Sequence, residues 1–234
     1  MRYLIIIPAR QGSKRLPGKN LRIMNGKPLI AHTLEAALNC GIDAEVCVSS
    51  DSQEVLAVAR EYGVETPFVR PAELAGDEAR SIDVVLHALA FHRARGQQFA
   101  SVVLLQPTSP LRTASHVRDA VALFEQRRAN SVVSVCEVEH PPSWTMQLDS
   151  SRSLDGFAGA LGARSRDDRR YYRLNGALYI SQADVLVSCK SFFSGCRSYA
   201  YVMCKDSSVD VDDIIDFRLA EMLMSERDRS SVQS

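Results

Sequence analysis

Apolar residues along the first two-thirds of the chain follow two alternating patterns. Short continuous apolar runs are typical of buried strands, whereas apolar residues that recur every three or four positions are typical of helices. The runs predict strands at 3–8, 45–49, 101–105 and 131–136, and the helical spacing predicts helices at 28–38, 53–62, 81–95 and 114–127. This alternation predicts an α/β fold, Rossmann-like, with a mainly parallel sheet and helices on both faces.

The pattern changes after Glu137, where two adjacent prolines, a polar stretch and the charged run 164–173 follow. Prolines and polar stretches of this kind are typical of loops and insertions. We therefore expect residues 1–234 to form a single domain into which a small dimerisation lobe is inserted at about 140–195. A strand at 199–202 and a helix at 214–224 complete the expected elements.

Charge and cysteine usage narrow the class of protein. The 28 basic and 28 acidic residues give a net charge of +0, which provides no electrostatic reason to expect nucleic acid or membrane partners. The six cysteines form no CxxC pair and no apolar segment is long enough to span a bilayer, so we expect reduced, mostly buried thiols and a cytoplasmic location. The five histidines lack metal-ligand spacing, which disfavours zinc chemistry and a histidine-based triad.

The loop after the first expected strand is the first candidate for a binding site. Ligands of open α/β sheets bind where strands end, and this loop reads PARQGSKRLPGKN (8–20). Its glycines allow backbone N–H groups to approach phosphate oxygens, and its arginines and lysines would neutralise a triphosphate. The loop lacks the Walker A ending and the GxGxxG fingerprint of dinucleotide sites. The alternative is a solvated basic surface loop.

Four blocks of the sequence resemble a known family. They are IIPARQGSKRLPGKN (6–20) with GKPLIAHTLEAAL (26–38), RPAELAGDEARSIDVVLHAL (70–89), LLQPTSPLRTASHV (104–117), and RLNGALYI (173–180) with VDVDD (209–213). In this order and spacing they resemble the acylneuraminate cytidylyltransferases, also called CMP-N-acetylneuraminic acid synthetases. The resemblance implies a fold of the nucleotide-diphospho-sugar transferase type.

The same resemblance implies a reaction. CMP would pass from CTP to the anomeric hydroxyl of an acylneuraminate, an acidic nine-carbon sugar, and pyrophosphate would leave. A cytidylyltransferase for legionaminic, pseudaminic or another ulosonic acid is an open alternative, and a non-catalytic nucleotide-binding protein is a rival from another class. The resemblance also implies a homodimer.

The resemblance assigns residues to both substrates. Those matching the nucleotide site are Ala9, Arg10, Gly12, Ser13, Lys14, Lys19, Asn20, Arg70, Ala79 and Ser81, and those matching the sugar site are Gln106, Arg166, Asn175, Tyr179, Phe192 and Phe193. Without the family block, Arg70 would be interpreted as a surface arginine before a proline turn. Phe192 and Phe193 are expected from the partner subunit, although adjacent residues of a strand cannot both face one side, so one of them could belong to the core.

Two aspartates near the end of the chain are candidates for metal binding. Asp210 and Asp212 alternate along an extended stretch, which points both carboxylates to one face. Carboxylates in this arrangement suit Mg²⁺ (or Mn²⁺), a hard ion that prefers oxygen ligands. With Arg10 and Lys19 they form the expected catalytic set. The alternative is capping of the following helix, which Asp213 fits better.

Overall fold

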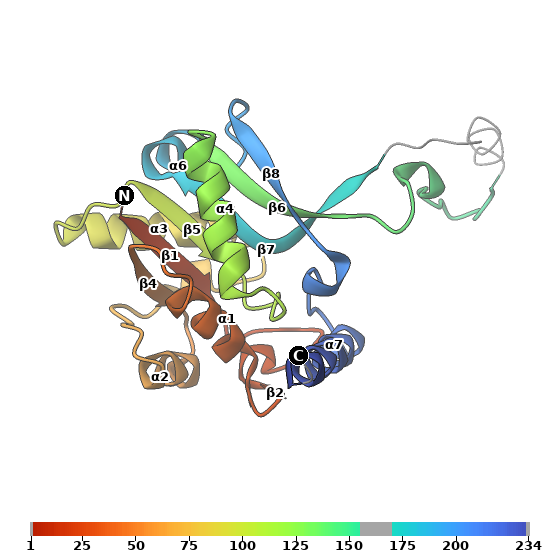
Figure 1. Ribbon diagram of the computed structural model, residues 1–234, viewed down its shortest axis with the longest axis horizontal. Helices are drawn as coiled ribbons and strands as arrows, with labels where there is room; N and C mark the ends of the chain where they lie inside the picture. Colours follow the sequence, from red (N-terminus) through yellow and green to blue (C-terminus); the bar gives the residue numbers. More distant parts are fainter. Residues whose placement is uncertain (1, 155–169, 233–234) are drawn as a thin grey trace.

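A six-stranded sheet forms the centre of the protein (Figure 1), in a computed structural model that describes residues 2–154 and 170–232. In spatial order the strands are β4 (Ala44–Ser49), β1 (Tyr3–Pro8), β5 (Ser101–Leu105), β7 (Tyr172–Gln182), β6 (Ser131–Glu137) and β8 (Ser198–Met203). The pairs β1–β4, β1–β5 and β6–β8 are parallel, whereas β7 runs antiparallel to both of its neighbours. The predicted mainly parallel sheet is confirmed.

Helices cover both faces of the sheet, as the sequence predicts. Those on the sheet are α1 (Leu29–Leu38), α2 (Gln53–Glu61), α3 (Ser81–Ala94), α4 (Ala114–Gln126) and α6 (Ala183–Cys189), whereas α7 (Ile214–Val232) packs in a separate apolar cluster. The 3₁₀ turns lie at Lys19–Leu21, Ala72–Leu74, Pro142–Trp144 and Lys205–Ser207. β2 (Ile23–Met24) and β3 (Lys27–Pro28) form a small antiparallel hairpin with a two-residue turn. Among the described helices, none has the length and apolar character to cross a membrane.

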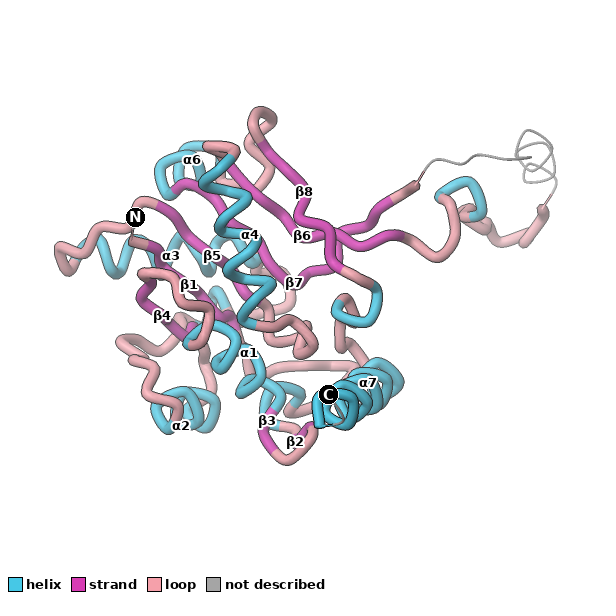
Figure 2. Tube along the Cα trace, viewed as in Figure 1, coloured by secondary structure: helices cyan, strands magenta, loops and turns pink. Residues whose placement is uncertain are grey.

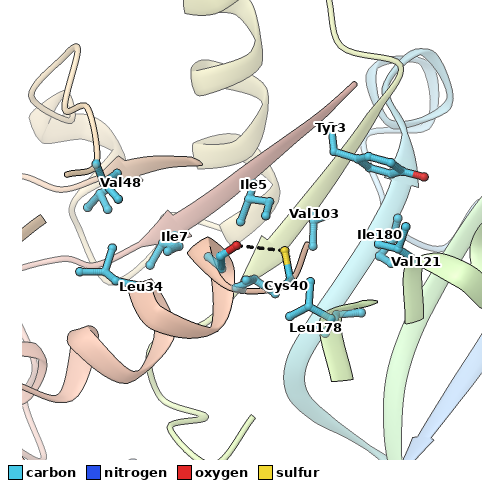
Figure 3. Packing of buried hydrophobic residues seen from close by; sticks show 14 of the residues in the cluster. Tyr3, Ile5, Ile7, Leu34, Cys40, Val48, Val103, Val121, Leu178 and Ile180 are labelled. Atoms are coloured by element: carbon cyan, nitrogen blue, oxygen red, sulfur yellow. Dashed lines mark hydrogen bonds between the residues drawn. The ribbon is translucent and has the colours of Figure 1, made fainter. Parts of the chain in front are cut away.

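Side chains of β1 alternate between two apolar clusters, because successive residues of a strand point to opposite faces. Ile5 and Ile7 pack with α1, α2 and α4, whereas Leu4 and Ile6 pack with α3 and α6. Figure 3 shows the first cluster, with Leu34 of α1 beside Ile7. Burial on both faces explains why the strand reads as a continuous apolar run.

The Ile5→Ala variant should lower the free energy of unfolding by about 2–5 kcal/mol, because it leaves a cavity in the close-packed first cluster. The Ile5 side chain is 0% exposed, whereas that of Ile23 is 59% exposed. The Ile23→Ala control should therefore stay within about 0.5 kcal/mol of the wild type. Urea unfolding of both variants measures the difference, and equal losses would contradict this description of the core.

The segment predicted as an inserted lobe is divided in the structure. β7 lies between β5 and β6 in the central sheet, and α6 packs beside it, so residues 172–189 belong to the main body. Beyond the body of the sheet, the paired ends of β6 and β7 continue outward as an arm (Figure 2), with Glu137 opposite Tyr172. Residues 155–169, including Arg166, lie outside the described residues. The role of the arm in dimerisation stays a prediction.

Two further expectations need correction. The last helix does not end near Met224 but continues to Val232. The thiols are free but not mostly buried, since Cys40, Cys47 and Cys136 are buried and Cys189, Cys196 and Cys204 are exposed. The cytoplasmic location stays a prediction.

Candidate active site

A pocket with a volume of about 510 Å³ opens where β1 and β5 end. Its walls are the loop after β1, the segment leading into α3, the loop after β5 and the acidic segment before α7. The residues expected from the sequence that line it are Arg10, Gly12, Ser13, Lys14, Lys19, Asn20, Arg70, Ala79, Ser81, Gln106, Asp210 and Asp212. The structure thus brings together candidates that are up to two hundred positions apart in the sequence. Ala9 is buried behind them, and its N–H donates to Ser49 O.

A third apolar cluster holds the loop after β1 against the acidic segment and α7. Leu16 of the loop after β1 packs with Val211 and with Phe217 of α7. Asn20 is 9% exposed, and its Nδ2 donates to Arg10 O over 3.0 Å, which supports the loop from within. The basic loop and the acidic segment are therefore held next to each other by a shared apolar cluster.

Two cations of the loop share one carboxylate. Arg10 Nη1 lies 2.7 Å from Asp77 Oδ1, and Lys14 Nζ lies 2.6 Å from Asp77 Oδ2. These ion pairs hold the pKa of Asp77 below its ordinary value, the hydrogen bond from Lys14 having the largest effect. An anionic ligand that used Arg10 and Lys14 would therefore have to compete with Asp77.

The Asp77→Asn variant should bind CTP more tightly, by roughly two- to five-fold, because a surface ion pair that competes for Arg10 and Lys14 is removed. Titration calorimetry at low and high salt measures the change, which should shrink at high salt. Glu78→Gln removes the same charge one residue away and serves as the control. An unchanged affinity for Asp77→Asn, or an equal gain in the control, would contradict competition by Asp77.

Arg70 is not the surface arginine of the alternative interpretation, because only 5% of it is exposed. Its Nε donates to Ser49 Oγ over 3.1 Å, and its Nη2 donates to Ser49 O. Burial lowers the pKa of Arg70 to about 10, while Asp51 opposes the shift, so the guanidinium is charged at pH 7. The guanidinium of Arg70, held in place and little exposed to solvent, therefore lines the pocket together with Ala79 and Ser81.

The acidic segment places Asp210 and Asp212 on the pocket side, as their alternation predicts. Lys19 Nζ donates to Val211 O over 2.6 Å and lies 3.4 Å from Asp212 Oδ1, while Arg15 Nη2 lies 2.9 Å from Asp212 Oδ2. Asp210 Oδ1 is buried and has no hydrogen-bond partner within the described part of the chain. Burial raises the pKa of Asp210, and Asp212 adds to this, while Thr108 and Lys19 act in the opposite direction.

These carboxylates fit a divalent cation. An orphaned buried carboxylate oxygen is costly unless a ligand satisfies it, and oxygen donors are what Mg²⁺ prefers. The neighbouring Asp213 caps α7 instead: its Oδ1 accepts from Ile215 N over 2.8 Å and from Asp216 N over 3.1 Å. The capping expected for Asp213 is confirmed, which leaves Asp210 and Asp212 to face the pocket.

Of the described residues expected to contact the sugar, only Gln106 lines the pocket that contains the nucleotide candidates. Gln106 lines the pocket, but Asn175 is 1% exposed, with Nδ2 donating to Ser208 Oγ over 2.9 Å. Phe192 is 6% exposed and packs in the core with Tyr179, at 5.3 Å between ring centroids, whereas Phe193 is exposed. In this conformation Asn175 makes its contacts within the protein, so its contact with the sugar stays a prediction, whereas Phe192 is the core residue of its pair.

Sequence reasoning missed several residues of the site. Asp77 carries no motif of its own, and only its distance to Arg10 and Lys14 identifies it. Thr108 and Arg15, which the sequence indicates only as members of their loops, line the pocket beside the carboxylates. Gly176 lies against Gln106 and Asp210, and the signal that could have found it is a glycine within the apolar pattern of a strand.

Comparisons with known proteins agree with this geometry. A family model described as "Cytidylyltransferase" matches residues 4–227. The CMP-N,N'-diacetyllegionaminic acid synthase of Legionella pneumophila is 40% identical, over 96% of this chain and 97% of its own length. The N-acylneuraminate cytidylyltransferase of Escherichia coli O18:K1:H7 is 37% identical over 99% of this chain, which spans 54% of that relative.

A solved structure shares the fold. The CMP:2-keto-3-deoxy-manno-octonic acid synthetase complexed with CTP matches with a TM-score of 0.74 at 20% identity, over 97% of this chain and 100% of the other. At this level of identity the likeness concerns the arrangement of helices and strands alone. Since the family model and two relatives cover nearly the whole sequence, the resemblance noted in its four blocks is confirmed, and the chain belongs to the cytidylyltransferase family.

Proposed function

We propose that the protein transfers CMP from CTP to the anomeric hydroxyl of an acidic nine-carbon sugar, an acylneuraminate or a close relative. The observation that carries this proposal is one pocket whose basic, glycine-containing loop faces two carboxylates across Lys19. In the reaction a bond forms between the sugar oxygen and the α-phosphorus, and the bond to the β-phosphate breaks to release pyrophosphate. Charge neutralisation and in-line positioning are what such a transfer requires.

The pocket offers separate places for the parts of CTP. Arg10 and Lys14 would contact the β- and γ-phosphates, and Lys19, which reaches Asp212, would contact the α-phosphate. Arg70 can donate to the acceptor atoms of cytosine, with Ser81 beside it. Because Arg70 is held by Ser49, the base would meet a rigid donor.

Asp210 and Asp212 would hold Mg²⁺ or Mn²⁺. A bound ion of this kind would supply charge neutralisation on the phosphates during the transfer. The unsatisfied Oδ1 of Asp210 supports this assignment. Lys19 and Arg15, both paired with Asp212, keep that carboxylate oriented toward the pocket.

The acceptor sugar is proposed to enter from a second cavity of about 760 Å³ that adjoins the first. Arg15, Asp210 and Asp212 line both cavities, and Arg173 and Lys205 line the second one. Arg173 and Lys205 would pair with the carboxylate of an acidic sugar, but they share this cavity with the carboxylates of Glu137, Glu139 and Asp206. Gln106 stands on the wall of the first pocket and would contact the sugar near the reacting hydroxyl.

A legionaminic acid is the second candidate acceptor. The relative that acts on it is 40% identical and matches this chain over 97% of its own length. The two sugar types differ in ring substituents, which the same cavity would have to distinguish.

A homodimer is part of the proposal. Trp144, Met146 and Leu148, on the chain that follows β6, are exposed apolar residues of the kind that interfaces bury. Light scattering should give twice the mass of one chain, 25.9 kDa. Replacing Trp144 and Leu148 with serine should shift the monomer–dimer equilibrium toward the monomer.

Pyrophosphate release tests the proposed reaction. CTP with Mg²⁺ is offered with N-acetylneuraminate, legionaminate and pseudaminate separately, and ATP and UTP replace CTP as controls. We expect release with CTP and at least one of these sugars, and loss of release when the metal is chelated. A protein that binds CTP but releases no pyrophosphate with any sugar would favour the non-catalytic alternative.

A further inference from the structure

The pairing of β7 with β6 is interrupted by a register shift beside the pocket. Val133 pairs with Tyr179 and Val135 with Leu174, so four residues of β7, 175–178, lie opposite Ser134 alone. Leu178 N donates to Ser134 Oγ over 2.8 Å, and that hydroxyl donates to Asn175 Oδ1 over 2.6 Å. The strand therefore bulges in a fixed shape, as bulges beside active sites commonly do.

A buried arginine fastens the bulge to the loop after β5. Arg112 is 2% exposed, and its Nη1 donates to Ala177 O and to Gln106 O, both over 3.1 Å. Burial lowers the pKa of Arg112 to about 9, so the guanidinium is charged at pH 7. Arg112 Nη1 thus links the backbone of the bulge to the backbone of Gln106 through two hydrogen bonds.

Gly176 is the residue that the bulge presents to the pocket wall. Its φ of +75° lies in the left-handed region, and a Cβ built on it would lie 2.9 Å from Gln106 Oε1 and 3.5 Å from Asp210 Oδ2. The other described glycines with positive φ have nothing within 4 Å of such a Cβ. The backbone conformation favours glycine at this position, and a Cβ here would also force the flexible end of Gln106 to shift.

We infer that Gly176 is a positioning residue that sets the separation of the Gln106 amide from the Asp210 carboxylate. This inference rests on the proposed function, in which Gln106 faces the sugar and Asp210 the metal. A methyl group at position 176 displaces the end of the flexible Gln106 side chain. Asp210 moves less, because the adjacent Val211 N donates to Thr108 O over 2.7 Å. The sugar contact is therefore lost while the nucleotide site stays in place.

Steady-state kinetics of the Gly176→Ala variant test this inference. The kcat/KM for the sugar should fall by roughly 10- to 100-fold, because a small misplacement of a positioning group has effects of this size. The KM for CTP should stay within about two-fold of the wild type, since its proposed contacts lie on other walls. The matched control is Gly96→Ala, whose φ of +77° imposes similar strain with nothing within 4 Å of the new Cβ. Its kinetics should equal those of the wild type.

The Gln106→Ala background separates positioning from a general loss of structure. Once the amide is absent, adding Gly176→Ala should change kcat/KM for the sugar little further, so the two effects should be strongly non-additive. Additive losses, an equal rise in the KM for CTP, or unchanged sugar kinetics of Gly176→Ala would overturn the inference.

Folding failure is also informative. If Gly176→Ala does not fold although Gly96→Ala, with similar backbone strain, does, the double variant with Gln106→Ala should recover folding, because the atom 2.9 Å from the new Cβ is gone. Failure of the double variant would then overturn the inference. A wild-type protein that turns over no substrate pair refutes the proposed function instead.

Discussion

Replacing Asp212 with alanine should reduce turnover by on the order of 100- to 1,000-fold while CTP binding is largely retained. A pre-placed charged group that acts on the transition state has effects of this size. Asp212 sits between Arg15 and Lys19 at the pocket wall, so its removal would disturb the proposed metal site without touching Arg10 or Arg70. Pyrophosphate release measures turnover, and calorimetry measures CTP binding.

The control for this prediction is Asp213→Asn. Asp213 carries the same charge one position later, and its Oδ1 accepts from Ile215 N and Asp216 N at the start of α7. Asparagine is an equally good cap, so this variant should keep its activity. A parallel loss of CTP binding and turnover in Asp212→Ala would contradict a role specific to the transfer step. Equal losses in both variants would also contradict it.

Replacing Lys19 with alanine should lower kcat by on the order of 100-fold or more, for a related reason. The Lys19 side chain is 11% exposed, and Val211 O accepts from its Nζ over 2.6 Å. The ammonium is therefore held at one point, between the basic loop and the carboxylates, where little water screens it. The Lys19→Arg variant should not restore full activity, because a planar guanidinium does not fit the place of a compact ammonium.

Arg22→Ala is the matched control for Lys19. Arg22 follows the same 3₁₀ turn, but its Nε donates to Pro17 O at the exposed side of the loop. Its loss removes one positive charge and should leave kcat nearly unchanged. Thermal midpoints of both variants show whether folding is retained. A decrease for Lys19→Ala no larger than that for Arg22→Ala would refute the assigned position.

Much of the fold follows from local pattern. Ser101–Leu105 and Tyr3–Pro8 are strands as predicted, because apolar runs of this length are stable only where both faces are covered. The start of α2 was also predictable, since Ser52 Oγ accepts from Val55 N as a helix cap does. The end of α7 was not, because a polar surface helix lacks the apolar period that reveals its length.

The features of the candidate site also fall into two groups, those that the sequence shows and those that only the structure shows. The sequence by itself determined the basic loop after β1 and the alternation of Asp210 and Asp212, because both depend on the order of neighbouring residues. Only the tertiary structure decided that β7 enters the sheet between β5 and β6, that Arg70 is buried, and that Gly176 meets Gln106. These features depend on contacts between residues far apart in the chain, which local periodicity does not encode.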